Sequence, residues 1–346
     1  MSRYSLADDL GAIDAAVGSA WAGLRGVRLF MTGGTGFIGR WMLEALVHAD
    51  EAYGLNAHAT VLTRSPAVFA ARAPHLAHHR AIRLVTGDVL TLAPDGERYT
   101  HFLHAATDAS ADLNLHQPAR MFDTVITGTR RALDFAVASG VDRFFFFSSG
   151  AVYGAQPWAL THVGEDWGGG PDSRDPRNAY AEAKRAAELL CAIYAKAHGL
   201  DTIGARIFAL LGPLLSLDIH FAAGNFIRDA LAGRAVRVEG SGTAVRSYLY
   251  AADLTAWLWT MVLRAKPGSV YNVGSEEAVT IAELAARIAD LLGTVGHEVL
   301  GRPDPGWNPG RYVPSTALIR RELGVTAAIG LDEAIRRTAA FNGWNE

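Results

Sequence analysis

The chain has 346 residues, of which 50% are hydrophobic and 19% are charged, and its formal net charge is −3. This balance indicates a globular protein with a large core and excludes extended disorder. The slight acidity gives no indication of a nucleic-acid partner or of a basic membrane-binding surface. No apolar stretch approaches the roughly 18 to 20 residues that are needed to span a bilayer. A lone cysteine, Cys191, excludes an internal disulfide.

The first segment, residues 1–26, is predicted to be a helical extension. Residues 7–24 have the pattern of an amphipathic helix that leads into the first strand. The N-terminus lacks a charged-then-apolar leader, so we expect a cytoplasmic protein.

Strand-like and helix-like segments alternate from residue 28 to about residue 210, which is typical of a parallel sheet wrapped by helices. The strand at 143–149 contains four consecutive phenylalanines and is predicted to be buried on both faces. We therefore predict an α/β fold with a Rossmann-type, doubly wound parallel sheet. The strands are predicted at 28–32, 58–63, 82–86, 101–105, 143–149 and 202–208, and the helices at 38–49, 66–72, 118–139 and 178–198.

The pattern changes after Gly212-Pro213, where short strands mix with helices. We predict that residues 27–212 form the Rossmann domain, which a C-terminal segment rejoins, and that residues 213–346 are mainly a smaller α/β part that binds substrate. Its strands are predicted at 235–238, 248–250 and 270–272, and its helices at 222–232, 252–264, 280–292 and 331–341.

A glycine-rich turn connects the first strand to the first long helix. Gly33, Gly36 and Gly39 are spaced by three residues between an apolar run and a helical pattern. In a dinucleotide site, one glycine makes the tight turn, one lets the backbone approach a pyrophosphate, and one lets the helix pack on the strand. The N-terminus of that helix then holds the phosphates. The turn predicts an NAD(P)-binding domain.

The end of the second strand bears on the choice of cofactor. An NAD site would place an acidic residue there, about 20 residues beyond the turn, whereas this chain has Thr63-Arg64-Ser65. A guanidinium and two hydroxyls suit the 2′-phosphate of NADP, so NADP is favoured over NAD. Stacking of Arg64 on the adenine of NAD is the alternative.

Three residues together form a candidate catalytic group. Ser149 lies at the end of the phenylalanine-rich strand, where open α/β sheets bind their ligands. Tyr180 and Lys184 are separated by four residues and share one face of a helix. A nearby ammonium favours the phenolate form of tyrosine, so Tyr180 is predicted to act as the general acid/base while Ser149 positions a substrate oxygen.

With these motifs the chain resembles the extended short-chain dehydrogenase/reductase family, in its nucleotide-sugar epimerase/dehydratase branch. The resemblance implies that Ser149, Tyr180 and Lys184 are the catalytic triad. It also implies that the aspartate of Gly87-Asp88-Val89 meets the adenine and that the strand end His104-Ala105-Ala106 lies beside the cofactor. The cofactor-binding residues expected in this way are Gly33, Thr35, Gly36, Phe37, Ile38, Arg64, Asp88, Val89, His104, Ala105, Ala106, Tyr180 and Lys184.

Later motifs resemble those that separate sugar-nucleotide enzymes from other members of the family. Arg206-Ile207-Phe208 is similar to the entry of the substrate loop, and Arg246 lies in a segment similar to the one that binds a nucleotide diphosphate. The family often has an asparagine where this chain has Ala209, so we expect Asn225 and Arg246 to bind the diphosphate instead. A turn or cap role for Asn225 is the alternative.

One departure from the family pattern affects the reaction. Dehydratases that make 4-keto-6-deoxy sugars carry an Asp-Glu pair after the catalytic hydroxyl residue, and this chain has Gly150 and Ala151. Because neither side chain can transfer a proton, 4,6-dehydration is disfavoured. UDP-glucuronate decarboxylases usually keep a glutamate at this position, so decarboxylation is disfavoured as well.

The resemblance therefore implies a nucleotide-sugar epimerase that acts through a transient 4-keto intermediate, with NAD(P) as cofactor and a nucleotide-diphosphate sugar as substrate. NADPH-dependent reduction of a 4-keto sugar nucleotide is the alternative. A non-catalytic NADP-sensing protein is a third possibility, but such proteins typically lose the Tyr/Lys pair. The family also implies a homodimer formed through the helices at 118–139 and 178–198.

The sequence leaves two roles open for several polar residues. His162, Glu165, Asp166 and Asp108 either assist proton transfer or cap loops. The spacing of His75, His78 and His79 gives no metal site and indicates a solvated helix end. Trp257 and Trp259 follow an apolar helix pattern and are predicted to lie in the core or an interface.

Overall fold

A seven-stranded, fully parallel sheet is the centre of the computed structural model, which describes residues 4–107, 111–218, 222–304 and 310–345. The order across the sheet is β3-β2-β1-β4-β5-β6-β11. The order reverses between β1 and β4, which defines a doubly wound Rossmann-type fold and confirms the predicted fold class. The strands are β1 Arg28–Thr32, β2 His58–Thr63, β3 Ile82–Thr86, β4 His101–His104, β5 Arg143–Ser149, β6 Asp201–Ile207 and β11 Val270–Val273.

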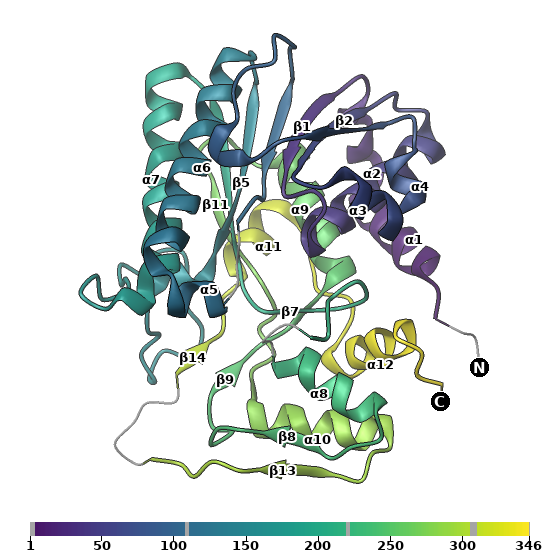
Figure 1. Ribbon diagram of the computed structural model, residues 1–346, viewed down its shortest axis with the longest axis vertical. Helices are drawn as coiled ribbons and strands as arrows, with labels where there is room; N and C mark the ends of the chain where they lie inside the picture. The colour runs from purple at the N-terminus through teal and green to yellow at the C-terminus, as the bar shows by residue number, and fades with distance from the viewer. Residues whose placement is uncertain (1–3, 108–110, 219–221, 305–309, 346) are drawn as a thin grey trace.

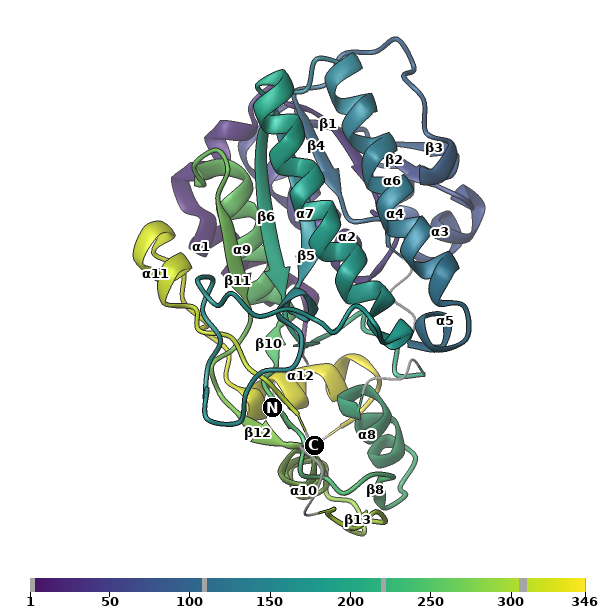
Figure 2. The same cartoon turned by 90° about the vertical axis from the view of Figure 1, so that its left-hand side faces the viewer.

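Helices cover both faces of this sheet (Figures 1 and 2). On one face α6 (Pro118–Ala138) and α7 (Ala179–His198) run side by side across β4, β5 and β6. On the other face α9 (Ala251–Arg264) packs against α2 (Phe37–Tyr53) and α1 (Leu6–Val17). The shorter helices are α3 Pro66–Arg72, α4 Pro74–Ala77, α5 Ala111–His116 and α11 Ala317–Leu323.

The four phenylalanines of β5 explain why this strand is central. Phe144 and Phe146 belong to the core beneath α6 and α7, while Phe145 and Phe147 belong to the core beneath α2 and α9. All four are at most 4% exposed. Alternate residues of a strand point to opposite faces, so an unbroken apolar run is what a strand covered on both sides requires. The prediction of burial on both faces is confirmed.

The N-terminal extension is not one continuous helix. α1 ends at Val17, because Gly18 takes a positive φ of 56°, and a 3₁₀ helix follows over Gly18–Leu24. Asp9 fixes α1 to the rest of the protein: its fully buried carboxylate accepts hydrogen bonds from Tyr4 and Tyr250 and pairs with Arg337 at 2.7 Å.

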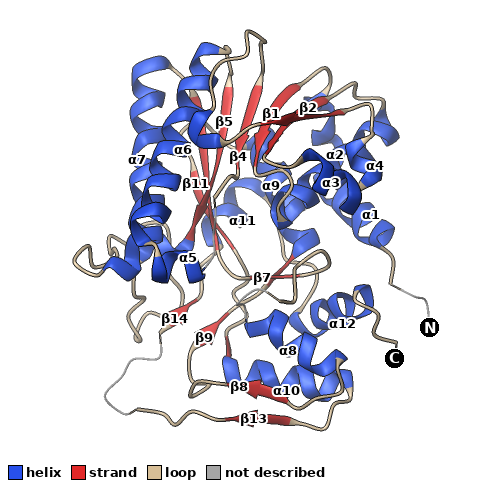
Figure 3. Cartoon of the chain, viewed as in Figure 1, coloured by secondary structure: helices blue, strands red, loops and turns tan. Residues whose placement is uncertain are grey.

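The smaller part lies beyond the carboxyl ends of β5 and β6 (Figures 1 and 3). Its helices α8 and α10 pack on each other and on β8, and α12 packs on α10. A capping box between Thr280 and Glu283 starts α10. Its elements are β7 Leu210–Leu211, α8 Ala222–Leu231, β8 Val236–Val238, β9 Val245–Arg246, β10 Leu249–Tyr250, β12 Val279–Thr280, α10 Ile281–Leu292, β13 His297–Val299, β14 Arg311–Tyr312 and α12 Leu331–Phe341.

Candidate active site

The glycine turn between β1 and α2 has the shape that its spacing predicts. Gly33 has a φ of 72°, and a Cβ there would lie 2.5–2.6 Å from the backbone of Ala105 and Ala106. A Cβ at Gly39 would collide with the backbone of Gly33 and Gly34. Gly36 is the N-cap of α2 and supplies no side-chain cap, so the first N–H groups of the helix are available to an anion.

A cavity of about 660 Å³ opens at this turn. A pyrophosphate and its nucleoside fit this cavity, because a helix N-terminus and closely approaching glycine backbone lie at it. Arg64, Arg72 and Arg120 line it as well. Its lining includes most of the residues predicted to bind the cofactor, namely Gly33, Thr35, Gly36, Arg64, Asp88, Val89, Ala105 and Ala106, together with Thr32, Leu62, Thr63, Ser65, Val68, Phe69, Arg72, Gly87, Leu90, Thr107, Arg120, Asp123 and Thr124.

Other predicted cofactor residues are placed outside this lining. Phe37 and Ile38 are half-buried and pack against the core, so what they offer a phosphate is the backbone of the first helical turn. His104 is 2% exposed, and its ring lies between the hydroxyls of Thr32 (2.8 Å) and Thr129 (3.1 Å). Burial lowers the pKa of His104 to about 3, so this ring is a neutral structural bridge beneath the turn.

Asp88 lies in the cavity wall at the end of β3. One of its oxygens accepts a hydrogen bond of 2.9 Å from the backbone N–H of Leu90 and thereby caps a 3₁₀ turn. The neighbouring Val89 side chain packs beside Gly128 of α6.

The catalytic candidates meet where β5 ends against the start of α7. Ser149 is the last residue of β5, and its Oγ accepts from the backbone N–H of Ala151 at 3.2 Å. It lies near enough to Tyr180 to lower the pKa of that phenol. Lys184 is 2% exposed and donates from Nζ to the carbonyl of Phe147 at 2.7 Å and to Thr107 Oγ1 at 2.8 Å. Because Thr107 also lines the cavity, Lys184 links the cavity wall to β5 at Phe147, two residues before Ser149.

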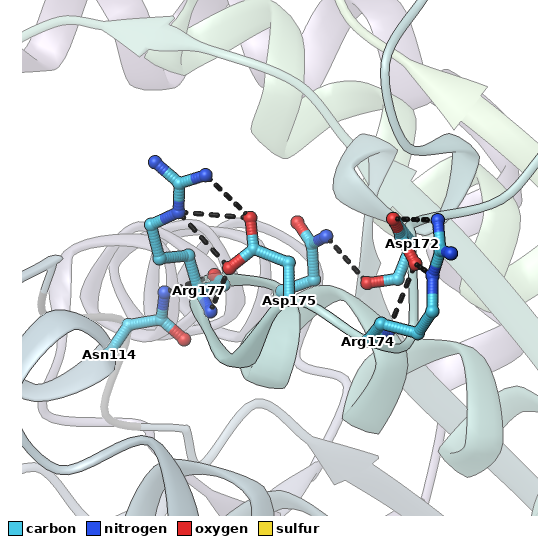
Figure 4. Close-up of polar contacts among 6 residues, drawn as sticks. Asn114, Asp172, Arg174, Asp175 and Arg177 are labelled. Carbon is cyan, nitrogen blue, oxygen red and sulfur yellow. Dashed lines mark hydrogen bonds and ion pairs between the residues drawn. The ribbon is translucent and has the colours of Figure 1, made fainter.

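Asn114 of α5 fixes the start of the catalytic helix. Its Oδ1 accepts from the backbone N–H of Tyr180 at 3.0 Å, and its Nδ2 donates to the carbonyl of Arg177 at 2.7 Å. The chain before the helix is stabilised by the local ion pairs Asp172–Arg174 and Asp175–Arg177 (Figure 4). These contacts hold Tyr180 by its backbone and leave its hydroxyl free to face Ser149.

The protonation of the tyrosine and lysine is governed by burial. Burial raises the pKa of Tyr180 above its ordinary value, and the hydrogen bond with Ser149 only partly offsets this effect. That Lys184 lowers the pKa of Tyr180 therefore stays a prediction, and burial dominates in the protein without cofactor. Burial lowers the pKa of Lys184 itself to about 7, against an opposing effect of Glu188, so its ammonium is only partly populated at neutral pH.

A buried polar network supports the site from below. Glu188 accepts from Ser148 at 2.5 Å and from Arg206 Nη2 at 2.7 Å. Arg206 Nη1 donates to the Tyr153 hydroxyl at 2.8 Å, which donates in turn to Asn272 Oδ1 at 2.7 Å. The network ties β5, α7, β6 and β11 together, and it occupies the guanidinium of Arg206 within the protein.

The two predicted diphosphate-binding residues lie in the smaller part. Arg246 of β9 is half-buried and donates from Nη1 to the carbonyls of Val245 (2.8 Å) and Gly310 (3.2 Å), and burial lowers the pKa of its guanidinium. Asn225 is a half-buried residue of α8, on a helix that packs against α10 and β8.

Of the residues left open from the sequence, Glu165 and His162 now have partners, and Asp108 lies outside the described residues. Glu165 accepts from the backbone N–H of Asn272 at 2.8 Å, and burial raises its pKa. His162 Nε2 contacts the carbonyl of Glu276 at 3.1 Å, and Asp166 is exposed. The contacts of Glu165 and His162 are made to backbone groups, which is typical of residues that hold a loop in place.

The histidines near residue 75 are not simply solvated. His75 pairs with Glu44 at 2.9 Å and His79 with Glu51 at 3.3 Å. Trp257 and Trp259 are 2% and 1% exposed, so they lie in the core, as predicted. Over the described ranges, no group of three or more His, Cys, Asp or Glu side chains is arranged to hold a metal ion.

Three residues of the site were not found from the sequence: Thr107, Asn114 and Tyr312. Tyr312 of β14 brings its hydroxyl to 3.4 Å from Ser149 Oγ. Thr107 and Asn114 follow the predicted strand end at residue 105, which was a usable signal because ligands bind at such ends. Tyr312 lies 163 residues beyond Ser149 in a stretch rich in Gly and Pro, and nothing there indicated an active-site role.

The fold and this site define an NAD(P)-binding Rossmann-type enzyme of the extended short-chain dehydrogenase/reductase kind. Residues 29–274 match the model of the NAD dependent epimerase/dehydratase family, and the chain belongs to that family. It is 28% identical over 317 residues to UDP-glucuronic acid decarboxylase 1 of Danio rerio, with 91% of this chain and 72% of that protein covered. It is also 28% identical over 324 residues to dTDP-glucose 4,6-dehydratase of Streptomyces niveus, covering 91% and 92%.

Solved structures agree with this assignment. UDP-glucose 4-epimerase of Thermotoga maritima, solved with UDP-glucose, superimposes with a TM-score of 0.77 at 22% identity, over 91% of this chain and 98% of that one. UDP-glucose 4-epimerase of Thermus thermophilus, solved with NAD, gives 0.73 at 25% identity, over 91% and 99%. Among the described helices, none is long and apolar enough to cross a membrane.

Proposed function

We propose that this protein interconverts nucleotide-diphosphate sugars as an epimerase, through a transient 4-keto intermediate. The observation that carries the proposal is the contact between Lys184 and Thr107, because it links the wall of the cofactor cavity to the helix that also carries Tyr180. A bound nicotinamide would accept and return hydride. The protein's own residues would position a sugar hydroxyl at Ser149 and move its proton through the Tyr180 phenol.

The residues after Ser149 favour epimerisation or reduction over the reactions of several relatives. Gly150 and Ala151 cannot donate or accept a proton, whereas dehydration needs a further acid and base. The site has what oxidation and re-reduction of one carbinol require. Reduction of a 4-keto sugar nucleotide is the alternative, and it is favoured by the basic residues in the cavity wall.

Those basic residues support NADP as the cofactor. Arg64 and Ser65 line the cavity just beyond β2, where a free ribose 2′-hydroxyl would call for a carboxylate, and Arg72 at the end of α3 lines it as well. Asp88 and Asp123 line the same cavity. Similar solved structures contain NAD, so the preference between NADP and NAD is to be measured on this protein.

Turnover of a substrate panel tests the proposal. The purified protein is first analysed by mass spectrometry for carried-over cofactor, and then assayed with UDP-glucose, UDP-galactose, UDP-glucuronate and dTDP-glucose. Epimerisation gives the C4 epimer with no net consumption of cofactor, whereas reduction of a 4-keto sugar consumes NADPH stoichiometrically. Release of CO₂ or formation of a 4-keto-6-deoxy sugar from the panel would overturn the proposal.

We further propose that two copies pair through α6 and α7. Leu189 and Ile193 lie one helical turn apart on α7 and are 62% and 49% exposed, and Phe122 of α6 is 38% exposed. Covering them in a four-helix contact would remove this apolar surface from water. Light scattering should give twice the mass of the chain, and Leu189→Glu should halve it; a monomeric wild-type protein would exclude this arrangement.

A further inference from the structure

A buried carboxylate of the N-terminal extension binds segments from both ends of the chain. Asp9 of α1 is fully buried, and its Oδ1 accepts from Arg337 Nη1 at 2.7 Å. Its Oδ2 accepts from the hydroxyls of Tyr4 at 2.7 Å and Tyr250 at 2.5 Å. Three donors from three separate segments therefore converge on one side chain.

This carboxylate is not part of the region that the family shares. Asp9 and Arg337 both lie outside residues 29–274, the part of the chain that matches the family model. Burying a charge is costly unless the charge is paired and hydrogen-bonded, and Asp9 is both. Burial and the nearby carboxylate raise the pKa of Tyr250, so its phenol stays protonated and remains a donor. Asp9 is therefore a fully satisfied attachment point.

Two partners of Asp9 lie next to the elements that carry the residues proposed to bind the diphosphate. Tyr250 belongs to β10 and follows Arg246 of β9 by four residues. Arg337 belongs to α12, which packs against β10 and also against α8, the helix of Asn225. One carboxylate thus holds the neighbouring element of each of these two residues.

The extension is also attached to the helices that cover the sheet. α1 packs against α9 and α2, and Asp14 Oδ2 accepts from the hydroxyl of Tyr53 of α2 at 2.7 Å. The ring of Trp21, in the 3₁₀ helix that follows α1, lies 5.5 Å from that of Trp259 of α9. The extension is therefore fixed on the side of the sheet, and through Asp9 it reaches the smaller part.

We propose that Asp9 is a positioning residue for the substrate: it holds α12 and the β9–β10 segment in place, and thereby positions Asn225 and Arg246 for the diphosphate. This inference rests on the proposed function. Because Asp9 is fully buried, it acts through its protein partners. It should therefore affect affinity for the nucleotide diphosphate and leave proton transfer at Tyr180 largely unchanged.

Binding measurements on the full-length, cofactor-loaded protein test this inference, with UDP and dTDP as probes. Asp9→Asn keeps the shape of the side chain and removes the charge that holds Arg337. The dissociation constant of the nucleotide that binds should rise about five- to tenfold. Affinity for the cofactor should not change, because the cofactor cavity is lined by residues between Thr32 and Thr124. Asp14→Asn is the matched control, since it lies on the same helix and contacts only the sheet side through Tyr53.

A second comparison separates positioning from stability. Asp9→Leu leaves Arg337 buried without its partner and should lower the urea midpoint of unfolding. The double variant Asp9→Leu/Arg337→Leu removes both charges and should recover much of that loss. If Asp9 positions the diphosphate site, nucleotide affinity stays low in the double variant. Affinity that recovers together with stability would overturn the inference.

Hydrogen exchange gives a readout that needs no ligand. Amides of β10 and α8 should exchange faster in Asp9→Asn than in the wild type, whereas Asp14→Asn should leave them unchanged. Equal exchange in Asp9→Asn and wild type, or equal nucleotide affinity, would overturn the inference. If the wild type binds neither UDP nor dTDP, the proposed function fails and this inference with it; normal wild-type binding with an unaffected Asp9→Asn variant removes only this inference.

Discussion

Glu188 lies one helical turn beyond Lys184 on α7, yet the carboxylate bonds to Arg206 at 2.7 Å while the ammonium bonds to Thr107 at 2.8 Å. Glu188 therefore acts on Lys184 only through a longer-range charge interaction, and the lysine N–H groups donate to the neutral oxygens of Thr107 and Phe147. This arrangement leaves burial as the dominant influence on the lysine pKa, which falls to about 7.

Stability should consequently depend on pH through Lys184. Below pH 7 both folded and unfolded chains hold the proton, and folding bears the full cost of burying the charge. Between pH 7 and the ordinary lysine pKa only the unfolded chain holds it, so the free energy of unfolding rises by up to about 1.4 kcal/mol per pH unit. Urea unfolding of the cofactor-free protein at pH 7, 8 and 9 should show this rise relative to Lys184→Met. Parallel pH dependences of the two proteins would contradict it.

Removal of the Tyr180 hydroxyl should abolish proton transfer. We expect Tyr180→Phe to lower kcat by about 10²- to 10⁴-fold, because the phenol is the proton carrier, while sugar-nucleotide affinity changes little. Tyr194→Phe on the same helix is the control, since its hydroxyl bonds to Asp134 outside the site. Equal turnover by Tyr180→Phe and wild type would remove this tyrosine from the chemistry.

Asn114 should act on kcat through the position of the helix. Asn114→Leu breaks the bond to the carbonyl of Arg177, which is drawn beside Asn114 in Figure 4, and the bond to the N–H of Tyr180. We expect about a tenfold loss of kcat and about 1–2 kcal/mol of stability. Asn114→Asp keeps an acceptor for the Tyr180 N–H and should restore most of the activity. Hydrogen exchange at the Tyr180 amide gives the structural readout: faster exchange is expected only in the leucine variant.

Gly150→Ala should destabilise the protein by about 1–3 kcal/mol, because its Cβ would press on Phe208. Phe208→Leu removes the outer ring atoms, so the double variant should be more stable than the sum of the single effects predicts. Gly168→Ala, where nothing lies within 4 Å of the added Cβ, is the control. Simple additivity in thermal unfolding would show that the two residues do not compete for space.

Arg64→Ala should reduce the preference for NADP over NAD. The exposed guanidinium can make a charge-assisted contact with the 2′-phosphate, so we expect the ratio of the two affinities to fall about tenfold. Titration of both cofactors by intrinsic fluorescence measures the ratio, with Arg264→Ala as an exposed control outside the cavity. A constant ratio would indicate that Arg64 contacts adenine or nothing at all.

The sheet and its cofactor turn could be predicted because their signals are local. A few neighbouring residues are enough to interpret the glycine spacing at 33, 36 and 39 and the run of four phenylalanines in β5. The short strands β7, β9, β12 and β14 carry no such pattern, since pairs of two residues are specified by the chain around them. Tyr312 depends on such a strand, and that is why the sequence gives no indication of it.

The pKa values of Tyr180 and Lys184 could not be predicted from the local sequence pattern either. The spacing of Tyr180 and Lys184 places both on one helix face, but their pKa values depend on how deeply α7 is buried against β5 and on where Glu188 finds its partner. Those are tertiary properties.

Strand β11 has a consequence for dividing the chain. It returns from the smaller part to pair with β6, and α9 reaches the opposite face with Trp259 donating to the carbonyl of Met42. A fragment that stopped at residue 212 would expose the edge of β6 and uncover that face of the core, and exposed edges invite aggregation. The cofactor half is therefore not a detachable module, and any chimera that exchanges the sugar-binding part must keep α9 and β11 from the parent that supplies the sheet.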